Sequence, residues 1–535
     1  LSAVLAMSAT SCTDYLDRDP SIEVSETVAF QNFTNFQGFI EEMYNCIPEK
    51  ESCFWCTTFN WGEDEIMNAG MGNSHLSAHM DLGDYRHINT DNQNFVNGVT
   101  SADDPNATAN PSSTNKFDHR IYPHSGYCIR KCNMGLKAIE DGWTSGCSEE
   151  EINVLKGQLL FFRAWWHNQV MDFYGGMPYI TEVLDGSKAM PMTRLSYREA
   201  ALLAAKDYEA AAELLPADWD KSGPGRATKG KNELRITKAT ALAYAGKCLL
   251  WAASPLMENN DLGVMEAGSK TYEYNQEIAN KAAEVLAKAL ILVESGKTPY
   301  SLAEYKYADI YNHTRDKSSV TNYTDIFYTT GQSWKQAGTC EAMLRGSQRD
   351  INGSPWNFAK LWGSKLDNFV GHDQIIHLPT ANYVNYAYGM ENGEPAYIFD
   401  GDELVPNTAA GFDPAHPFLN RDPRFYHDIV FDGMHLVEEN WEGDLRVRQN
   451  YASLYTGGFQ RDATLGSRTG YFCQKLVSKS CNEKDKMYEW AGAFEAYLPY
   501  MRLADVYLLY AEAVVAAKKG DGAVGGYVKA SEAIN

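Results

Sequence analysis

The sequence lacks any run of about eighteen or more apolar residues, so no segment of it is long enough to span a bilayer as a helix. Basic residues are also few. There are 47 Lys and Arg against 70 Asp and Glu, for a formal net charge of -23 and a pI near 5.0, with no basic stripe. Because such a chain repels phosphate backbones, nucleic acid is not expected as a partner. A Gly-rich phosphate loop, a Ser nucleophile elbow and a Cys–His constellation are absent too, so no cofactor is expected.

The sequence contains 11 Cys, but none of them belongs to a complete metal-site motif. Cys53-x2-Cys56 and Cys128-x3-Cys132 each have a spacing that can place two thiolates on one ion. Neither has a second Cys or His pair at metal-site spacing. A disulfide within one pair and buried, inert thiols are the other two interpretations. No bound metal is expected.

What the sequence has in abundance is length, apolar residues and aromatic rings. Its 535 residues, 44% of them hydrophobic, can bury a large core, and length alone allows one large domain or two to four ordinary ones. Aromatics make up 12% of the chain, with 12 Trp and 32 Tyr, which is more than helix packing needs. Some rings are therefore expected in surface grooves, where flat apolar ligand faces can stack on them.

The N-terminus is similar to the end of a bacterial lipoprotein signal. The segment 1–10 is short, apolar and rich in small residues, and Ser11 and Cys12 follow it directly. In such a lipobox the Cys becomes the acylated first residue, and a polar tether follows, as residues 13–26 would here. Ala9 departs from the pattern, which prefers Leu at that position, and an ordinary small-residue N-terminus is the alternative. We predict lipidation at Cys12.

Helical periodicity is strongest over residues 152–173, where apolar residues recur at steps of three or four and form one apolar face. Two Gly residues and a Pro at 175–178 end this helix. Further helices are predicted over 197–215, 236–253, 278–296 and 498–517. Each is too amphipathic to stand alone in water, so neighbours are expected to pack as antiparallel pairs.

Between residues 300 and 489 the periodicity fades, and Gly, Pro, Asn, Asp and aromatic residues predominate. This composition indicates long ordered loops with short strands or helices. Long ordered loops on a helical scaffold often carry binding sites. The predicted fold is therefore mainly α: a tetratricopeptide-like superhelix of helical pairs, with long irregular loop insertions and minor β-structure.

Several segments, in a fixed order, resemble the SusD/RagB family of outer-membrane nutrient-binding lipoproteins. In chain order they are a tether motif at 15–20, a helix motif at 157–166, the Tyr-Gly-Gly segment that ends this helix at 172–178, and the start of a later helix at 235–241. A Pro-to-Asn-Gly block at 378–393, an Asn-Arg-Asp-Pro-Arg-Phe motif at 420–425 and a final helix motif at 500–513 follow. The resemblance covers about residues 12–535. Family members continue past the final motif, so the chain is interpreted as truncated at its C-terminus, and the missing Met and basic region indicate truncation at the start.

The resemblance implies a non-catalytic lipoprotein anchored on the extracellular face of the outer membrane of a Bacteroidetes-like cell. It would bind a glycan or oligosaccharide and deliver it to a SusC-like TonB-dependent transporter; some family members take a peptide or glycopeptide instead. On this interpretation the chain divides into a signal-peptide remnant, a lipoprotein tether, a helical scaffold, a loop-rich ligand and partner region, and a C-terminal helical segment. Their bounds are 1–11, 12–29, 30–299, 300–490 and 491–535.

Most of the motif residues are expected to build the fold. Arg163, Arg502, Asp505 and Glu512 lie on helices whose other face is apolar, so we predict paired charges that bridge helices. Within residues 420–425, an Asp-Pro pair sets a turn, and the two arginines can bond backbone carbonyls or nearby carboxylates.

The ligand site implied by the resemblance is broad, exposed and formed by loops. Sugar C–H faces stack on Trp or Tyr, and sugar hydroxyls need Asn, Asp, Arg or Gln partners. The ligand-binding candidates in the loop-like stretches are Trp55, Trp61, Asn73, Asp84, Tyr85, Trp334, Trp356 and Trp362, with Asn68, Arg86, Gln332 and Asn357 near them.

Other kinds of site remain open. His75-x3-His79 has the spacing of a metal pair on one helix face, although no Glu stands between the two as in a zinc protease, and solvated or capping polar groups are the alternative. The acidic clusters at 63–65 and 400–403 allow a glycoside hydrolase, which needs two carboxylates about 5 to 10 Å apart, or are plain acidic surface. A helical scaffold that binds only protein is the third hypothesis.

Overall fold

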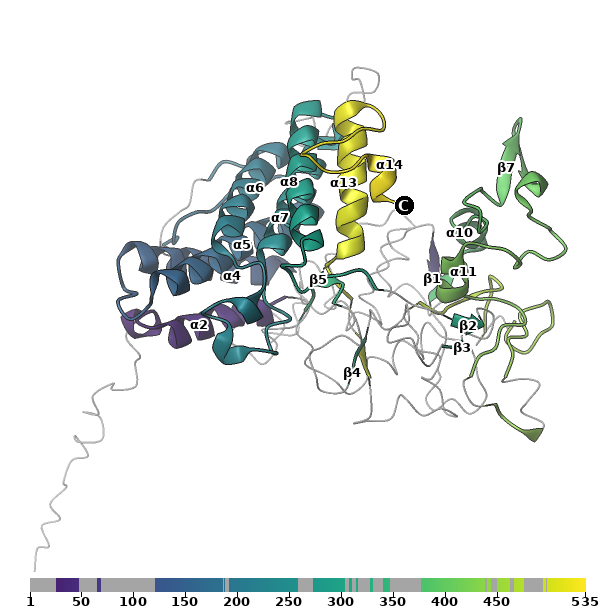
Figure 1. Cartoon of the computed structure of the whole chain (residues 1–535), viewed down its shortest axis with the longest axis horizontal. Helices are drawn as coiled ribbons and strands as arrows, with labels where there is room; N and C mark the ends of the chain where they lie inside the picture. Colours follow the sequence, from purple (N-terminus) through teal and green to yellow (C-terminus); the bar gives the residue numbers. More distant parts are fainter. Residues whose placement is uncertain are drawn as a thin grey trace, which may run out of the picture.

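The computed structural model describes most of the helical part of the chain and a large share of its second half. The described residues are 26–47, 65–68, 121–185, 187, 192–257, 273–303, 307–309, 314–315, 328–330, 340–346, 377–437, 440–443, 450–461, 466–475, 494–496 and 498–535. Long helices stand side by side in one stack, and a smaller unit of short elements lies apart from them (Figure 1).

Six long helices form the stack, each packed against the next: α4 on α5, α5 on α6, α6 on α7, α7 on α8, and α8 on α13. Helix α2 covers α5, and the short α14 packs on α13. The bounds are α2 (Phe33–Asn45), α4 (Ile121–Glu140), α5 (Glu149–Tyr174), α6 (Tyr197–Leu214), α7 (Lys238–Ala253), α8 (Gln276–Glu294), α13 (Leu503–Lys518) and α14 (Ala530–Ala533). The predicted helices and the mainly α class are confirmed.

Local sequence fixes where these helices begin and end. Ser148 caps α5 and Ser196 caps α6, each through a capping box in which a Glu three residues later bonds back to the cap. Gly175 ends α5 with a φ of 75°, a conformation that favours glycine. The helix predicted from residue 498 begins only at Leu503, because the two residues before it pair with the strand β5 (Ala342–Leu344).

The β-structure is minor and consists of two-stranded antiparallel ladders, as expected for loop insertions. They pair β1 (Ile66–Asn68) with β6 (His377–Pro379), β2 (Tyr307–Asp309) with β3 (Thr314–Arg315), β4 (Tyr328–Thr330) with β11 (Phe494–Ala496), β5 (Ala342–Leu344) with β12 (Met501–Arg502), β7 (Tyr397–Asp400) with β8 (Glu403–Pro406), and β9 (Ile429–Val430) with β10 (Phe472–Cys473). Short helices complete the described elements: η1 (Glu26–Ala29), η5 (Trp219–Lys221), η6 (Arg226–Thr228), η7 (Pro255–Met257), η9 (Thr408–Ala410), α10 (Ala381–Tyr386) and α11 (Pro423–Asp428).

Helix α5 is the centre of the main core. Every residue from Gly157 to Met171 is buried, because α2, α4, α6 and α7 all contact this helix. The predicted single apolar face is therefore an underestimate, since the helix is covered on all sides. Trp165 and Trp166 are fully enclosed and lie edge to face, with ring centroids 4.8 Å apart. Glycines permit close helix approach, as at Gly246, where an added Cβ would lie 2.3 Å from the Leu286 side chain.

The predicted charge pair between helices is confirmed for Arg163, whereas Arg502 lies in β12 and its partner Glu341 is not part of a helix. Arg163 of α5 makes a two-pronged ion pair with Asp207 of α6, at 2.7 and 2.8 Å. Arg502 pairs with Glu341 beside β5 at 3.2 Å, and Asp505 accepts from the Arg502 backbone N–H at the start of α13. Glu512 instead accepts a hydrogen bond from the hydroxyl of Tyr274.

Residues 377–475 contain a second hydrophobic core, made by α10, α11 and the strands near them. Arg421 of the Asn-Arg-Asp-Pro-Arg-Phe motif is only 2% exposed and lies at its centre. Its guanidinium donates to four backbone carbonyls, those of Val384, Tyr388, Gly389 and Pro417. Arg424 pairs with Asp422, whose side chain also caps α11. The prediction that these arginines bond carbonyls or carboxylates is confirmed.

Cys128 and Cys132 are buried, free thiols on α4, so the third interpretation of this pair is the correct one. Burial raises the pKa of both thiols, and the Cys132 Sγ contacts the Met43 Sδ at 3.2 Å. Cys53 and Cys56 lie outside the described residues. None of the described helices combines the length and the apolar character that crossing a membrane requires.

Candidate functional site

The eight predicted ligand residues all lie outside the described residues, as does Cys12. The same holds for the His75 and His79 pair, for Arg86, Gln332 and Asn357, and for the first two residues of the acidic cluster at 63–65. Asn68 is described only as part of the backbone of β1. The ligand-site prediction therefore stays a prediction.

Two ladders nevertheless show where the stretches that carry these residues attach. Strand β1 lies within the stretch from Trp55 to Arg86, and it pairs with β6 in the register Ile66 with Pro379 and Asn68 with His377. Strand β4 ends four residues before Trp334 and pairs with β11, in the chain just before α13. Strands β1 and β4 thus each pair with a described strand from the second half of the chain.

Among the described residues, a pocket lies where α7 begins. It encloses about 190 Å³, the room of roughly six waters. The pocket is formed by the 218–235 loop, the N-cap of α7 and two short segments near residues 300 and 340. Its lining residues are Asp218, Trp219, Asp220, Gly230, Asn232, Glu233, Arg235, Thr237, Pro299, Tyr300 and Cys340.

The 218–235 loop is folded by its own carboxylates and amides. Asp218 caps the short helix η5 and pairs with Lys221 at 3.0 Å. Asp220 accepts from the Gly230 backbone N–H and, at 2.7 Å, from the Asn232 side-chain amide. Most polar atoms of the loop therefore have partners within it, which gives the pocket a fixed wall.

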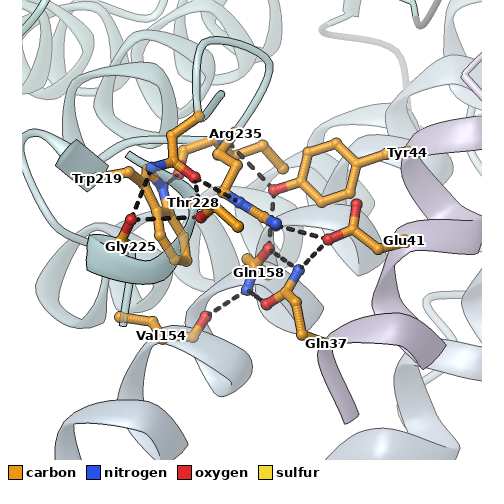
Figure 2. Close-up of polar contacts among 11 residues, drawn as sticks. Gln37, Glu41, Tyr44, Val154, Gln158, Trp219, Gly225, Thr228 and Arg235 are labelled. Carbon is orange, nitrogen blue, oxygen red and sulfur yellow. Dashed lines mark hydrogen bonds and ion pairs between the residues drawn. The ribbon is translucent and has the colours of Figure 1, made fainter. Parts of the chain in front are cut away.

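A second layer of polar contacts joins this loop to α2 and α5 (Figure 2). Arg235 lies over the Trp219 ring, 5.2 Å from its centroid, and pairs with Glu41 of α2 at 2.8 Å. Beside it, the Tyr44 hydroxyl donates to Gln158 at 2.9 Å and accepts from the Ile236 backbone N–H.

The amides of this layer bond to each other in both directions. Gln158 donates to Gln37 at 2.9 Å, and Gln37 donates back to Gln158 at 3.1 Å. Burial raises the pKa of Tyr44, which keeps its hydroxyl protonated and able to donate. This network was not predicted, although a Gln inside an otherwise apolar helix face signals a buried polar contact.

The chemistry that the pocket offers is hydrogen-bond acceptance. Asp218, Asp220 and Glu233 contribute carboxylate oxygens to its lining, while Arg235 is held by Glu41 and Trp219. Burial raises the pKa of the Cys340 thiol, so no thiolate nucleophile is available here. The described lining of the pocket provides no activated nucleophile.

Exposed rings, which can stack on sugars, are found in the 377–475 unit. The side chains of Tyr386, Tyr451 and Tyr455 are 54%, 47% and 61% exposed, and Tyr451 lies against the His435 ring at 5.0 Å. Sequence reasoning emphasised Trp and missed these tyrosines. By contrast, Trp165, Trp166 and Trp219 are at most 2% exposed and belong to the core.

The acidic cluster at 400–403 is the exposed turn of the β7–β8 hairpin. Its side chains project into solvent, which matches the interpretation of this cluster as acidic surface. No group of three or more His, Cys, Asp or Glu side chains in the described parts of the chain is arranged to hold a metal ion.

Two models of protein families match the chain. The model described as the SusD family matches residues 304–535. A SusD-like model described as starch-binding and associating with the outer membrane matches residues 14–250. A comparison with curated proteins found no relative.

Several solved structures are similar over most of the chain. A SusD-like protein from Bacteroides fragilis is 19% identical, with 92% of this chain and 78% of that one covered and a TM-score of 0.54. A SusD-like carbohydrate binding protein from the same organism is 16% identical, with coverages of 91% and 75% and a TM-score of 0.51. A SusD homolog from Bacteroides thetaiotaomicron is 13% identical, with coverages of 93% and 76% and a TM-score of 0.52. At these identities, the likeness establishes a shared fold.

Proposed function

Because this chain belongs to the SusD/RagB family, whose members are non-catalytic carbohydrate-binding proteins, we propose that it captures a nutrient glycan at the cell surface and passes it to a SusC-like TonB-dependent transporter. The observation that carries the proposal is the pair of family matches, which together span both the helical stack and the second half of the chain. The stack of paired helices with loop insertions is the scaffold expected for such a binder.

Attachment to the membrane is the first part of the proposal. The family model over residues 14–250 is described by association with the outer membrane. We place the acyl chains on Cys12, followed by a polar tether, with the helical stack and the loops on the extracellular side. Metabolic labelling with a fatty-acid analogue tests this: the chain with its natural leader is expected to be labelled, and Cys12→Ser to abolish the label. Labelling that persists in the variant would refute the anchor.

Ligand capture is the second part. We propose that the rings of Trp55, Trp61, Trp334, Trp356 and Trp362, with Tyr85 beside them, stack on sugar faces, while Asn73 and Asp84 bond the hydroxyls. Strands β1 and β4, which lie near these residues in the sequence, pair with β6 and β11. Exposed Tyr451 and Tyr455 are further stacking surfaces.

Affinity measurements on a panel of plant and host polysaccharides test the ligand. Retardation in glycan-loaded gels, followed by titration calorimetry, should identify a polysaccharide that binds. Trp334→Ala and Trp356→Ala should each weaken binding by roughly tenfold, or about 1.4 kcal/mol, through lost stacking. Trp251→Ala is the matched control, because this ring is 38% exposed but lies on α7 in the helical stack. A chain that retains no glycan, peptide or glycopeptide would be a pure protein scaffold.

The same incubations distinguish binding from hydrolysis. A binder leaves the glycan intact, so no reducing sugar should appear. Release of sugar that disappears in Asp402→Asn or Glu63→Gln would show a hydrolase and refute the proposal.

A further inference from the structure

The β7–β8 hairpin is firmly held at its base. The Tyr397 ring packs against Phe412 and Tyr386, with centroids 4.9 and 5.9 Å away. Asn407 follows β8 and bonds to the segment just before β7. Its backbone N–H donates to the Ala396 carbonyl and its side-chain amide donates to the Pro395 carbonyl, both at 2.9 Å. The direction in which the hairpin projects is therefore set by packing.

The far half of the hairpin exposes large apolar side chains. Phe399 is 75% exposed and Ile398 is 40% exposed. Phe399 pairs with Leu404 and Ile398 with Val405, so the alternation of side chains along a strand puts apolar groups on both faces. The hairpin stands out at the edge of the molecule (Figure 1). Scattered exposed apolar residues are ordinary, but a cluster on a fixed projection is typical of an interaction site.

The backbone of the hairpin is also open. Within the part of the chain that the structure describes, β7 and β8 pair only with each other. An isolated two-stranded ribbon is marginally stable in water, and its outer edges present backbone groups to a partner. A partner that covers the ribbon would stabilise it.

The charge around the hairpin indicates what kind of partner fits. Residues 377–420 contain no Lys or Arg. They contain six acidic residues: Glu391, Glu394, Asp400, Asp402, Glu403 and Asp413. An anionic lipid surface would repel this segment. Sugar sites are concave and rich in hydrogen-bonding groups, whereas this tip is convex and aliphatic as well as aromatic. An apolar pocket with a Lys and Arg rim on a protein complements it in shape and charge.

We propose that the β7–β8 hairpin is a docking element, in which Phe399 and Ile398 enter an apolar pocket rimmed by Lys and Arg on the extracellular side of the transporter. The carboxylates of Asp400, Asp402 and Glu403 lie at the rim and steer association. This inference rests on the proposed function, because the transporter is the partner named there.

The test is the affinity of the full chain for a SusC-like transporter from the same cell, purified in detergent. Phe399→Ala should weaken binding by roughly tenfold or more, as for a central aromatic contact. A triple variant, Asp400→Asn with Asp402→Asn and Glu403→Gln, should slow association and reduce its dependence on salt. Leu256→Ala is the matched control, since that side chain is 70% exposed in η7, and it should change affinity by less than about twofold.

Glycan retention by the same variants separates the possible outcomes. Normal retention with weakened transporter binding supports the docking element. Equal transporter affinity of Phe399→Ala and the unaltered chain overturns it and leaves the proposed function standing. Loss of retention with unchanged transporter binding makes the hairpin a sugar-stacking element and also overturns it. A chain that retains glycan but binds no transporter refutes the delivery step itself.

Discussion

Arg421 provides the sharpest test of how the second core is held together. Its guanidinium is buried, pairs with no carboxylate of the described residues, and donates to four backbone carbonyls. The charged group lies 5.0 Å from the centroid of the Phe425 ring and 5.6 Å from that of Phe412. Arg421→Lys preserves the charge and removes the planar fork, so it isolates the contribution of geometry.

The expected cost follows from the number of hydrogen bonds lost. A lysine ammonium is a single nitrogen and cannot reach all of the carbonyls that the guanidinium contacts from three different nitrogens. We expect about two of the four bonds to be lost. At roughly 1.5 to 3 kcal/mol for each bond to a charged donor, the free energy of unfolding should fall by about 3 kcal/mol or more. That is a large fraction of the stability of an ordinary domain.

Hydrogen exchange measured by mass spectrometry is the suitable assay, because the 377–475 core is separate from the core of the helical stack. Peptides spanning 384–389 and 421–430 should exchange faster in Arg421→Lys, while those from α5 should not change. Arg424→Lys is the matched control, with a side chain 62% exposed and paired only with its neighbour Asp422, and it should cost under about 1 kcal/mol. Equal protection in the two variants would refute the role assigned to the four carbonyls.

Three further predictions concern the helical stack, each measured by the free energy of unfolding. Asp207→Asn should lower it by about 3 kcal/mol, because Arg163 and the Tyr179 hydroxyl both bond this carboxylate between α5 and α6. Gly246→Ala should lower it by roughly 1 to 3 kcal/mol, since the new methyl group would overlap the fully buried Leu286. Burial lowers the pKa of His167 from 6.5 to about 4, so the unfolded chain binds more protons between these values. Stability should therefore be full above pH 6.5 and fall by about 3 kcal/mol towards pH 4, and His167→Gln should remove that part of the slope.

Each of these predictions has a control variant or an outcome that would contradict it. Glu213 lies on the same helix as Asp207, and its side chain is 78% exposed. If Glu213→Gln lowered the free energy of unfolding as much as Asp207→Asn, the stabilisation would not come from the ion pair with Arg163. Gly38→Ala, with nothing within 4 Å of the new methyl group, should instead stabilise α2 by roughly 0.5 to 1 kcal/mol. An unchanged pH slope in His167→Gln would contradict the neutral imidazole, which bonds the Arg163 carbonyl through one nitrogen and the Ile180 N–H through the other.

The helices that were predictable from sequence are those with an uninterrupted apolar repeat. α5, α6, α7 and α8 have such repeats together with Ser, Thr or Asn caps, and both signals are local. α2 and α4 were not singled out. α2 has an Asn cap and apolar residues at helical spacing and was detectable, whereas a Pro and two Gly residues weaken the helix propensity of α4. Packing against α5 outweighs a weak helix propensity. Local propensity cannot predict this packing, because the contacts come from residues distant in the sequence.

The site was less predictable than the scaffold for a similar reason. Arg421 could be assigned to architecture from its motif, since an arginine beside an Asp-Pro turn has few other uses. The network around Tyr44 and Gln158 joins residues more than a hundred positions apart, so no local pattern reveals it. The β7–β8 hairpin was predicted only as an acidic run, although a Gly-Asp pair such as Gly401–Asp402 between two short apolar segments is a two-residue hairpin signal. The exposure of Phe399 depends on where the hairpin projects, which is a property of the tertiary structure.

The complete enclosure of α5 has a consequence for evolution within the family. From Gly157 to Met171 the helix has no water-facing side. Almost any replacement there therefore disturbs packing or leaves a buried polar group without a hydrogen-bond partner. Mutations that survive selection should accumulate elsewhere, above all on projecting loops. Chains that share this segment are therefore expected to inherit the same framework while diverging in cargo.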